Sequence, residues 1–166
     1  MNNGENMLNI KLICVGKLKE KFYIDASSEY MKRLSSYCKI EIDELPEVRR
    51  SQSPSAGEIE ASLLKEAELI KSKLPSRSMI VAMCIEGVQM DSVQFSSLLE
   101  DAAASGISRI TFIIGGSDGL HPSIKALADK KLSMSKMTFP HHLARVMLLE
   151  QIYRGFKINE GGKYHK

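Results

Sequence analysis

The chain has 166 residues, 43% of them hydrophobic, and a formal net charge of +3 at pH 7; it is long enough for one well-buried core but short for two full domains. Because no apolar run approaches the roughly 20 residues that span a bilayer, and the N-terminus lacks the apolar stretch of a secretory signal, we expect no membrane segment. Cys14, Cys38 and Cys84 are odd in number, widely spaced and set in strand-like segments, which indicates buried reduced thiols and a cytoplasmic protein rather than disulfides or a metal site.

The first two predicted strands flank a predicted helix. Residues 8–15 are mostly apolar with β-branched members, which is typical of a buried strand. Apolar side chains then recur every four residues and predict one buried helix stripe, made of Phe22, Ala26, Tyr30 and Leu34. Residues 39–45 alternate apolar and polar side chains, which predicts a strand near the sheet edge. Because residues 1–6 are polar and precede all of these, we expect an N-terminal extension followed by a single domain over residues 7–166.

A polar loop and a second helix follow. Residues 47–57 combine Ser, Pro and Gly with charged side chains, which predicts a mobile loop. Two interpretations of its Arg49 and Arg50 stay open, an RNA contact or no contact at all. Ser55 and Glu58 have the spacing of a capping box and predict a helix that ends near residue 74.

The middle of the chain supplies two more strands around a third helix. Residues 79–85 are apolar throughout, as expected of a central strand covered on both faces. Asp91 and Gln94 have capping-box spacing and predict a helix after it; its buried stripe is Phe95, Leu98, Leu99 and Ala102. Residues 109–114 form the next apolar strand. The alternation of strands and helices predicts an α/β fold with a parallel sheet and helices on both faces.

The glycine loop, residues 115–119 (GGSDG), directly follows the last of these strands. In open parallel sheets, ligands lie beyond the carboxyl ends of the strands, and glycines there permit a close backbone approach. The loop is not GxGxxG and carries no Lys-Ser/Thr pair, which argues against a dinucleotide or ATP. A ligand site and a purely structural tight turn are the two interpretations.

A short segment, residues 132–140, leads into His141, His142 and a long helix. The two histidines invite a metal interpretation, but adjacent residues on a helix point to different sides and no Cys or carboxylate cluster accompanies them. We therefore predict helix capping and no metal. Residues 141–166 contain five cations and two anions, so their net charge of +3 equals that of the whole chain. An anionic partner for this segment and a solvated basic tail are both open interpretations.

Five stretches resemble the ribosomal large subunit methyltransferase H family. They are residues 13–19 (ICVGKLK), 112–120 (FIIGGSDGL), 132–141 (LSMSKMTFPH), 149–154 (LEQIYR) and 164–166 (YHK). The resemblance covers essentially the whole chain from Met7. Because that family belongs to the SPOUT class, the resemblance implies a parallel sheet with a C-terminal trefoil knot, a homodimer, and S-adenosylmethionine as methyl donor without a metal.

The resemblance also implies a substrate and site residues. The substrate is a pseudouridine of large-subunit (23S) ribosomal RNA, methylated at N3 on the assembled ribosome. The implied cofactor contacts are Met83, Gly115, Met134, Ser135, Lys136, Met137, Thr138 and Phe139. Arg154 is implied to stabilise negative charge on the uracil-like ring, with a phosphate contact or a surface cation as alternatives. The terminal residues are implied to act across the dimer: Tyr164 stacks on the flipped base, Lys166 holds phosphate, and His165 or a nearby group accepts the proton.

Two other functions stay open. A noncatalytic ribosome-binding module would use only the basic tail. A flavodoxin-like nucleotide-binding protein would have the same alternation of strands and helices, an unknotted chain and a bound flavin or nucleotide. The knot rests on the resemblance alone, since threading leaves no periodic trace in a sequence.

Overall fold

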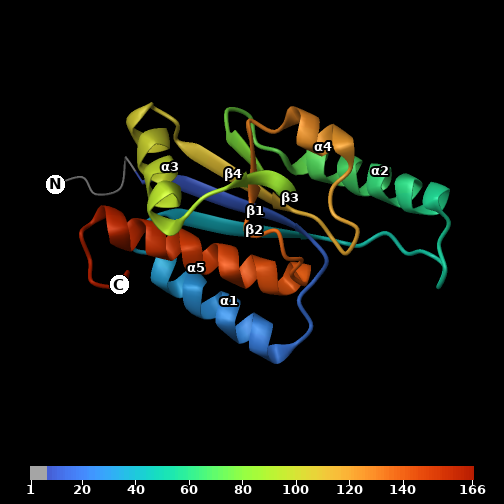
Figure 1. Ribbon diagram of the computed structural model, residues 1–166, viewed down its shortest axis with the longest axis horizontal. Helices are drawn as coiled ribbons and strands as arrows, with labels where there is room; N and C mark the ends of the chain where they lie inside the picture. The colour runs from blue at the N-terminus through green and yellow to red at the C-terminus, as the bar shows by residue number, and fades with distance from the viewer. Residues whose placement is uncertain (1–6) are drawn as a thin grey trace.

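The computed structural model describes residues 7–166 as a sheet between two layers of helices (Figure 1). The expected N-terminal extension, residues 1–6, lies outside the described residues. The strands are β1 (Asn9–Val15), β2 (Lys39–Leu45), β3 (Met79–Gln89), β4 (Arg109–Ile114) and β5 (Lys130–Ser133). The helices are α1 (Lys21–Leu34), α2 (Ala56–Lys73), α3 (Ser92–Ala104), α4 (Pro122–Leu127) and α5 (His141–Asn159).

All paired strands of the sheet run parallel, in the order β2-β1-β4-β3-β5. Helices α1, α3 and α5 cover one face, with α5 packed against both others, and α2 and α4 cover the opposite face (Figure 1). The predicted α/β fold with helices on both faces is therefore confirmed, as is the edge position of β2. The trefoil knot stays a prediction from the resemblance. Within residues 7–166, no helix is long and apolar enough to cross a membrane.

Two cores lie on the two faces of the sheet, because side chains alternate between faces along each strand. Leu12 and Cys14 of β1 belong to the core under α1, α3 and α5, whereas Ile13 and Val15 belong to the core under α2 and α4. Phe112 of β4 is completely buried in the first core. Each fully buried side chain of this size contributes roughly 1.5–3 kcal/mol of transfer free energy, so the central strands hold the layers together.

Two predicted burial patterns are wrong. In α1, Phe22 is 65% exposed and only Leu34 of the predicted stripe is fully buried, since the helix packs along α5 and buries the face that meets it. In β3, Ile85 is 51% exposed. The first half of this strand, up to Met83, pairs with β4. After a bulge, the second half pairs with β5 alone, so it has a neighbouring strand on one side and is less buried.

The predicted helix starts agree with the structure. The Ser55 side chain accepts a hydrogen bond from the Glu58 backbone N–H at 3.2 Å and caps α2. Asp91 and Gln94 form a complete capping box at α3. Pro122 occupies the first turn of α4, where its missing N–H costs no hydrogen bond.

Candidate functional site

The carboxyl ends of the parallel strands meet at one edge of the sheet, where a cavity of about 660 Å³ lies. Its walls come from the middle of β3, the glycine loop after β4, and the segment between β5 and α5. They include seven of the eight predicted cofactor residues: Met83, Gly115, Met134, Ser135, Met137, Thr138 and Phe139. Lys136, the eighth, is exposed and does not line this cavity. The binding roles of these residues stay a prediction.

The glycine loop is both a tight turn and a cavity wall. A Cβ atom at Gly115 would lie 2.3 Å from the Gly119 carbonyl oxygen, so no side chain fits there. Gly119 has a φ of +77°, which favours glycine, and its N–H donates to the Gly116 carbonyl at 3.1 Å. The glycine loop therefore presents mainly backbone atoms to the cavity.

The segment opposite the glycine loop is held by its own hydrogen bonds. The Ser133 hydroxyl donates to the Ser135 carbonyl at 3.0 Å, and the Ser135 hydroxyl accepts from the Met137 N–H at 3.0 Å. The cavity is thus enclosed by two short backbone loops and by apolar side chains such as Ile114 and Phe139. This combination suits a small ligand that needs backbone hydrogen bonds and an apolar slot.

A second cavity of about 580 Å³ adjoins the first. The two share Met83, Leu132, Ser133 and Met134 as a common wall. The second cavity extends along α5 to Glu150. Since Glu150 contacts Arg154 and Tyr164, this cavity connects two predicted catalytic residues to the region of the glycine loop.

Two of the three predicted catalytic residues, Arg154 and Tyr164, contact Glu150, which the sequence analysis missed, and the third, His165, contacts Arg154. Arg154 donates from Nε to Glu150 at 2.9 Å, and the Tyr164 hydroxyl donates to the same carboxylate at 3.3 Å. The Arg154 guanidinium lies 4.7 Å from the centre of the Tyr164 ring and 3.3 Å from Nδ1 of His165. The spacing of Glu150 and Arg154, one helical turn apart in the LEQIYR stretch, was the signal that could have identified it.

The segment after α5 folds back onto that helix. Tyr164 packs edge to face on Tyr153, with 4.9 Å between ring centres. Burial, followed by the proximity of Tyr30 and Glu150, raises the pKa of Tyr164 to about 12, so its hydroxyl stays protonated at neutral pH. Lys166 is exposed, and the structure brings it into none of these contacts.

The prediction that His141 and His142 cap α5 is wrong. Pro140 is the N-cap residue, and no side chain accepts a capping hydrogen bond there. The two rings lie side by side, 4.2 Å between centres, because both pack over Gly16, where a Cβ atom would lie 3.1 and 3.3 Å from their Nε2 atoms. Both Nε2 atoms are buried with no hydrogen-bond partner among residues 7–166. Burial, then the neighbouring imidazole, lowers the pKa of His141.

Among residues 7–166, each of these histidines has one carboxylate nearby. Glu47 lies 3.8 Å from His141, and Glu20 lies 3.7 Å from His142. No group of three or more His, Cys, Asp or Glu side chains suited to a metal ion occurs within the described part of the chain.

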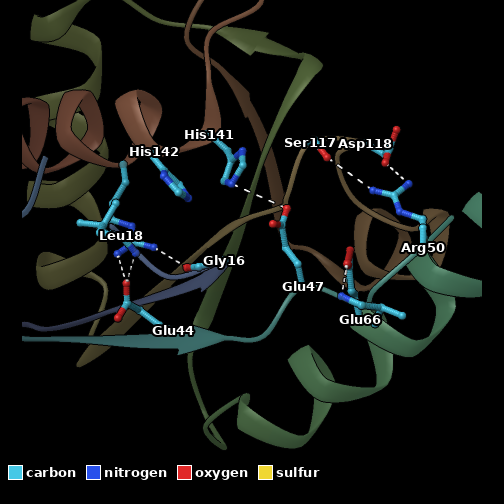
Figure 2. A network of polar contacts seen from close by, with 12 residues as sticks. Gly16, Leu18, Glu44, Glu47, Arg50, Glu66, Ser117, Asp118, His141 and His142 are labelled. Atoms are coloured by element: carbon cyan, nitrogen blue, oxygen red, sulfur yellow. Dashed lines mark hydrogen bonds and ion pairs between the residues drawn. The ribbon is translucent and has the colours of Figure 1, made fainter. Parts of the chain in front are cut away.

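Arg145, a buried arginine on α5, forms a hydrogen-bond network that the sequence did not predict. The Arg145 side chain is 2% exposed and donates to the Glu44 carboxylate at 2.7 Å and to the Gly16 carbonyl at 2.9 Å. The Leu18 N–H donates to the same carboxylate at 3.0 Å; Figure 2 shows Glu44, Gly16 and Leu18 together. Burial raises the pKa of Glu44, but the bonds from Arg145 and Leu18 outweigh it, and the pKa is lowered. This network ties the first turns of α5 to the loop after β1.

The cysteines follow the prediction in part. Cys14 and Cys38 are buried free thiols, and burial raises the pKa of each to about 12. Cys84 is only partly buried and lines the larger cavity. It follows Met83, the last residue of β3 that pairs with β4, so it lacks the cover that a central position would provide.

Sequence comparisons agree on one family. A family model described as predicted SPOUT methyltransferase matches residues 8–165. A Streptococcus sanguinis protein named ribosomal RNA large subunit methyltransferase H is 46% identical over 159 residues, which are 96% of this chain and 100% of the relative. A protein of the same name from Clostridium acetobutylicum is 48% identical over the same shares of both chains.

Solved structures with a similar fold are far more distant in sequence. A probable methyltransferase from Bordetella pertussis matches with a TM-score of 0.57 and 9% identity, over 90% of this chain and 95% of that one. A probable methylase family protein from Haemophilus influenzae matches with a TM-score of 0.52 and 12% identity, over 96% of this chain and 71% of that one. At such identities the likeness concerns the fold alone.

Proposed function

This chain belongs to the SPOUT methyltransferase family, and from that membership we propose that it methylates N3 of a pseudouridine in large-subunit ribosomal RNA. The relatives named as large-subunit methyltransferases, matched along their whole length, support large-subunit ribosomal RNA as the substrate. The observation that carries the proposal is the 660 Å³ cavity between the glycine loop and the segment before α5. The proposed enzyme acts in the cytoplasm, on the assembled ribosome, as a homodimer with a knotted C-terminal segment.

SPOUT methyltransferases use S-adenosylmethionine, and the residues of this cavity fit it. The volume lies within the range of roughly 300–1,000 Å³ that is usual for small-ligand sites. None of the lining residues among those described is Lys or Arg, which suits a cofactor without phosphates. Ile114, Leu132 and Phe139 offer an apolar slot for an adenine ring, and the backbone of the two loops offers hydrogen bonds to its edge. When bound, this cofactor supplies a methyl group already activated on a sulfonium.

Arg154 is the residue we assign to the charge that develops on the substrate ring. As the N3 proton leaves, negative charge spreads over the ring, and a fixed guanidinium stabilises it. Glu150 holds that guanidinium through a 2.9 Å hydrogen bond. The Tyr164 ring, 4.7 Å from the Arg154 guanidinium, is the surface on which we place the flipped base, with Lys166 on an adjacent phosphate.

His165 is our candidate for the proton acceptor, and its present contact sets a condition on that role. A guanidinium has only donors, so Nδ1 of His165 accepts from Arg154 at 3.3 Å and the ring proton resides on Nε2. The imidazole must leave Arg154 before Nδ1 can take the N3 proton. We therefore propose that substrate binding separates the two side chains.

The proposed homodimer draws support from apolar side chains near the cavities. Ile85 and Met137 line the larger cavity and are 51% and 74% exposed. Val88 and Val93, in β3 and α3, are also exposed. Exposed apolar side chains that lie together, as Ile85 and Met137 do at one cavity, are typical of an interaction surface. In the proposed dimer, residues 164–166 of one protomer complete the site of the other.

The test is transfer of a labelled methyl group from S-adenosylmethionine to three substrates. These are assembled ribosomes that lack the modification, isolated large subunits, and ribosomes whose target uridine was never isomerised. We expect label only on the assembled ribosomes that contain pseudouridine. Label on uridine-containing ribosomes would contradict the pseudouridine assignment, and label on isolated subunits alone would contradict the preference for the assembled ribosome.

The Arg154→Lys variant and a measurement of S-adenosylmethionine binding separate the alternatives. Arg154→Lys keeps the charge but loses the forked geometry, so we expect cofactor affinity as in the unchanged protein and turnover at least about 10-fold lower. A protein that binds S-adenosylmethionine but labels no ribosome would have another RNA substrate. A protein that does not bind the cofactor would be the noncatalytic ribosome-binding module.

A further inference from the structure

The strap, residues 46–54 between β2 and α2, lies against the glycine loop. We propose that Arg50 of the strap, assisted by Glu47, is a positioning residue that holds the glycine loop in the shape that binds S-adenosylmethionine. The inference rests on the proposed cofactor site and adds to it a residue that touches neither the cofactor nor the substrate. It assigns a role to a segment whose sequence predicts only a mobile loop.

The strap is anchored to α2 on both sides of Arg50. The Val48 N–H donates to the Glu66 carboxylate at 3.4 Å, and the Ser51 hydroxyl donates to Glu58 at 2.9 Å. Glu66 is buried. Its pKa is raised, chiefly by burial, and the bond from Val48 opposes that shift. With both flanks attached to a regular helix, the backbone at Arg50 has a fixed position.

From that position Arg50 reaches the glycine loop. Its guanidinium forms an ion pair with Asp118 and lies 3.4 Å from the Ser117 hydroxyl, as Figure 2 shows. The side chains of Arg50 and Asp118 are 20% and 33% exposed, so solvent screens the pair only in part. Ser117 and Asp118 are the two residues of the glycine loop that have side chains. Arg50 therefore contacts both side chains through which this loop can be held.

Glu47 makes a second contact with the same loop. A Cβ atom at Gly116 would lie 2.8 Å from the Glu47 carboxylate, so the strap packs directly on the loop backbone. Glu47 also points toward His141, 3.8 Å away (Figure 2). Gly116, Ser117 and His141 all line the larger cavity. The strap thus contacts two walls of the proposed cofactor site, the glycine loop and the start of α5.

The consequence concerns affinity more than turnover. Glycine has more backbone freedom to lose than other residues, and a loop that is ordered only when the ligand binds reduces affinity by the cost of that ordering. Without Arg50, the glycine loop must be ordered by the cofactor itself. We expect the dissociation constant for S-adenosylmethionine to rise roughly 3- to 10-fold, while the turnover number at saturating cofactor stays the same.

The experiment is calorimetric titration of S-adenosylmethionine into the full chain and five variants. Arg50→Ala and Asp118→Asn should each weaken binding by the stated factor, and their combination should weaken it no further than either alone. Arg50→Lys, which keeps the charge, should restore part of the affinity. The matched control is Arg49→Ala, since Arg49 is exposed and forms no ion pair within residues 7–166; its affinity should stay within twofold of the unchanged chain. In the methyl-transfer assay, Arg50→Ala should raise KM for the cofactor and leave kcat unchanged.

One further variant separates this inference from the proposed function. Phe139→Ala alters the cavity wall outside both the strap and the glycine loop. If Phe139→Ala weakens binding but Arg50→Ala stays within twofold of the unchanged chain, the strap inference is overturned and the cofactor site stands. If the unchanged chain does not bind S-adenosylmethionine, or Phe139→Ala binds equally well, both are overturned. Equal losses in Arg50→Ala and Arg49→Ala would also overturn the inference, since they would indicate a general effect of charge.

Discussion

The replacement of buried Arg145 by Leu tests whether the α5 network stabilises the fold. Breaking a buried ion pair costs about 3–5 kcal/mol when the remaining charge stays buried. Here the remaining Glu44 side chain is 33% exposed and can regain water, so its share falls to about 0.5–1 kcal/mol. The buried Gly16 carbonyl loses its 2.9 Å bond from Arg145, which costs about 1–3 kcal/mol. We therefore expect Arg145→Leu to lower the free energy of unfolding by about 1.5–4 kcal/mol.

Urea denaturation at pH 7 measures this change. Arg49→Leu, the same substitution at an exposed position, should stay within about 0.5 kcal/mol of the unchanged chain. Glu44→Gln and the double variant close a cycle in which we expect a coupling of at least about 0.5 kcal/mol, because the two groups share a hydrogen bond. A loss below about 1 kcal/mol for Arg145→Leu, or a loss equal to that of the control, would refute the argument that the network fixes α5.

The pH dependence gives the same network a second signature. The pKa of Glu44 is lowered in the folded chain, so the folded state holds its proton less tightly than the unfolded state does. The stabilisation is therefore present above the ordinary pKa of a glutamate and is lost as the pH falls below it. The difference between the unchanged chain and Arg145→Leu should shrink below about pH 4.3; a difference that grows there would contradict the assignment.

Two further predictions concern groups at and near the larger cavity. Iodoacetamide at pH 8 should alkylate partly exposed Cys84 well before buried Cys14 and Cys38. Bound S-adenosylmethionine should slow the alkylation of Cys84. Equal rates at all three thiols would contradict the burial pattern. Because burial and the adjacent imidazole lower the pKa of His141, the folded chain takes up a proton there less readily than the unfolded chain, and stability should fall as the pH drops below about 6.5. His141→Gln should show a shallower fall in urea titrations between about pH 6.5 and 5, and parallel curves would contradict it.

Local patterns in the sequence predicted the elements of the fold well. The apolar runs of β1 and β4, the capping box at Asp91 and the edge position of β2 follow from side-chain periodicity and backbone hydrogen bonding within a few residues. The position of the glycine loop after a buried strand was also predicted, although the sequence left a ligand site and a structural tight turn as alternatives. Seven predicted cofactor residues then line one cavity, although that part of the prediction came from the resemblance to a family rather than from periodicity.

The wrong predictions concern which part of the fold packs against a given side chain. Phe22 has helical spacing but faces outward, since α1 packs along α5. His141 and His142 were expected to cap a helix, and they instead pack together over Gly16, which supplies the space by having no side chain. Periodicity states that one face of a helix is apolar, but it does not state which element will cover that face.

By itself, the sequence determined the order of strands and helices, the position of the glycine loop and the family, because these depend on short-range spacing and on motifs kept in order along the chain. Only the tertiary structure decided which side chains far apart in the chain pair with one another. Arg145 and Glu44 are 101 positions apart in the chain, and Arg50 and Ser117 are 67 apart. Such pairs leave no local pattern, since they form only when parallel strands bring their carboxyl ends, and the loops that follow them, to one edge of the sheet.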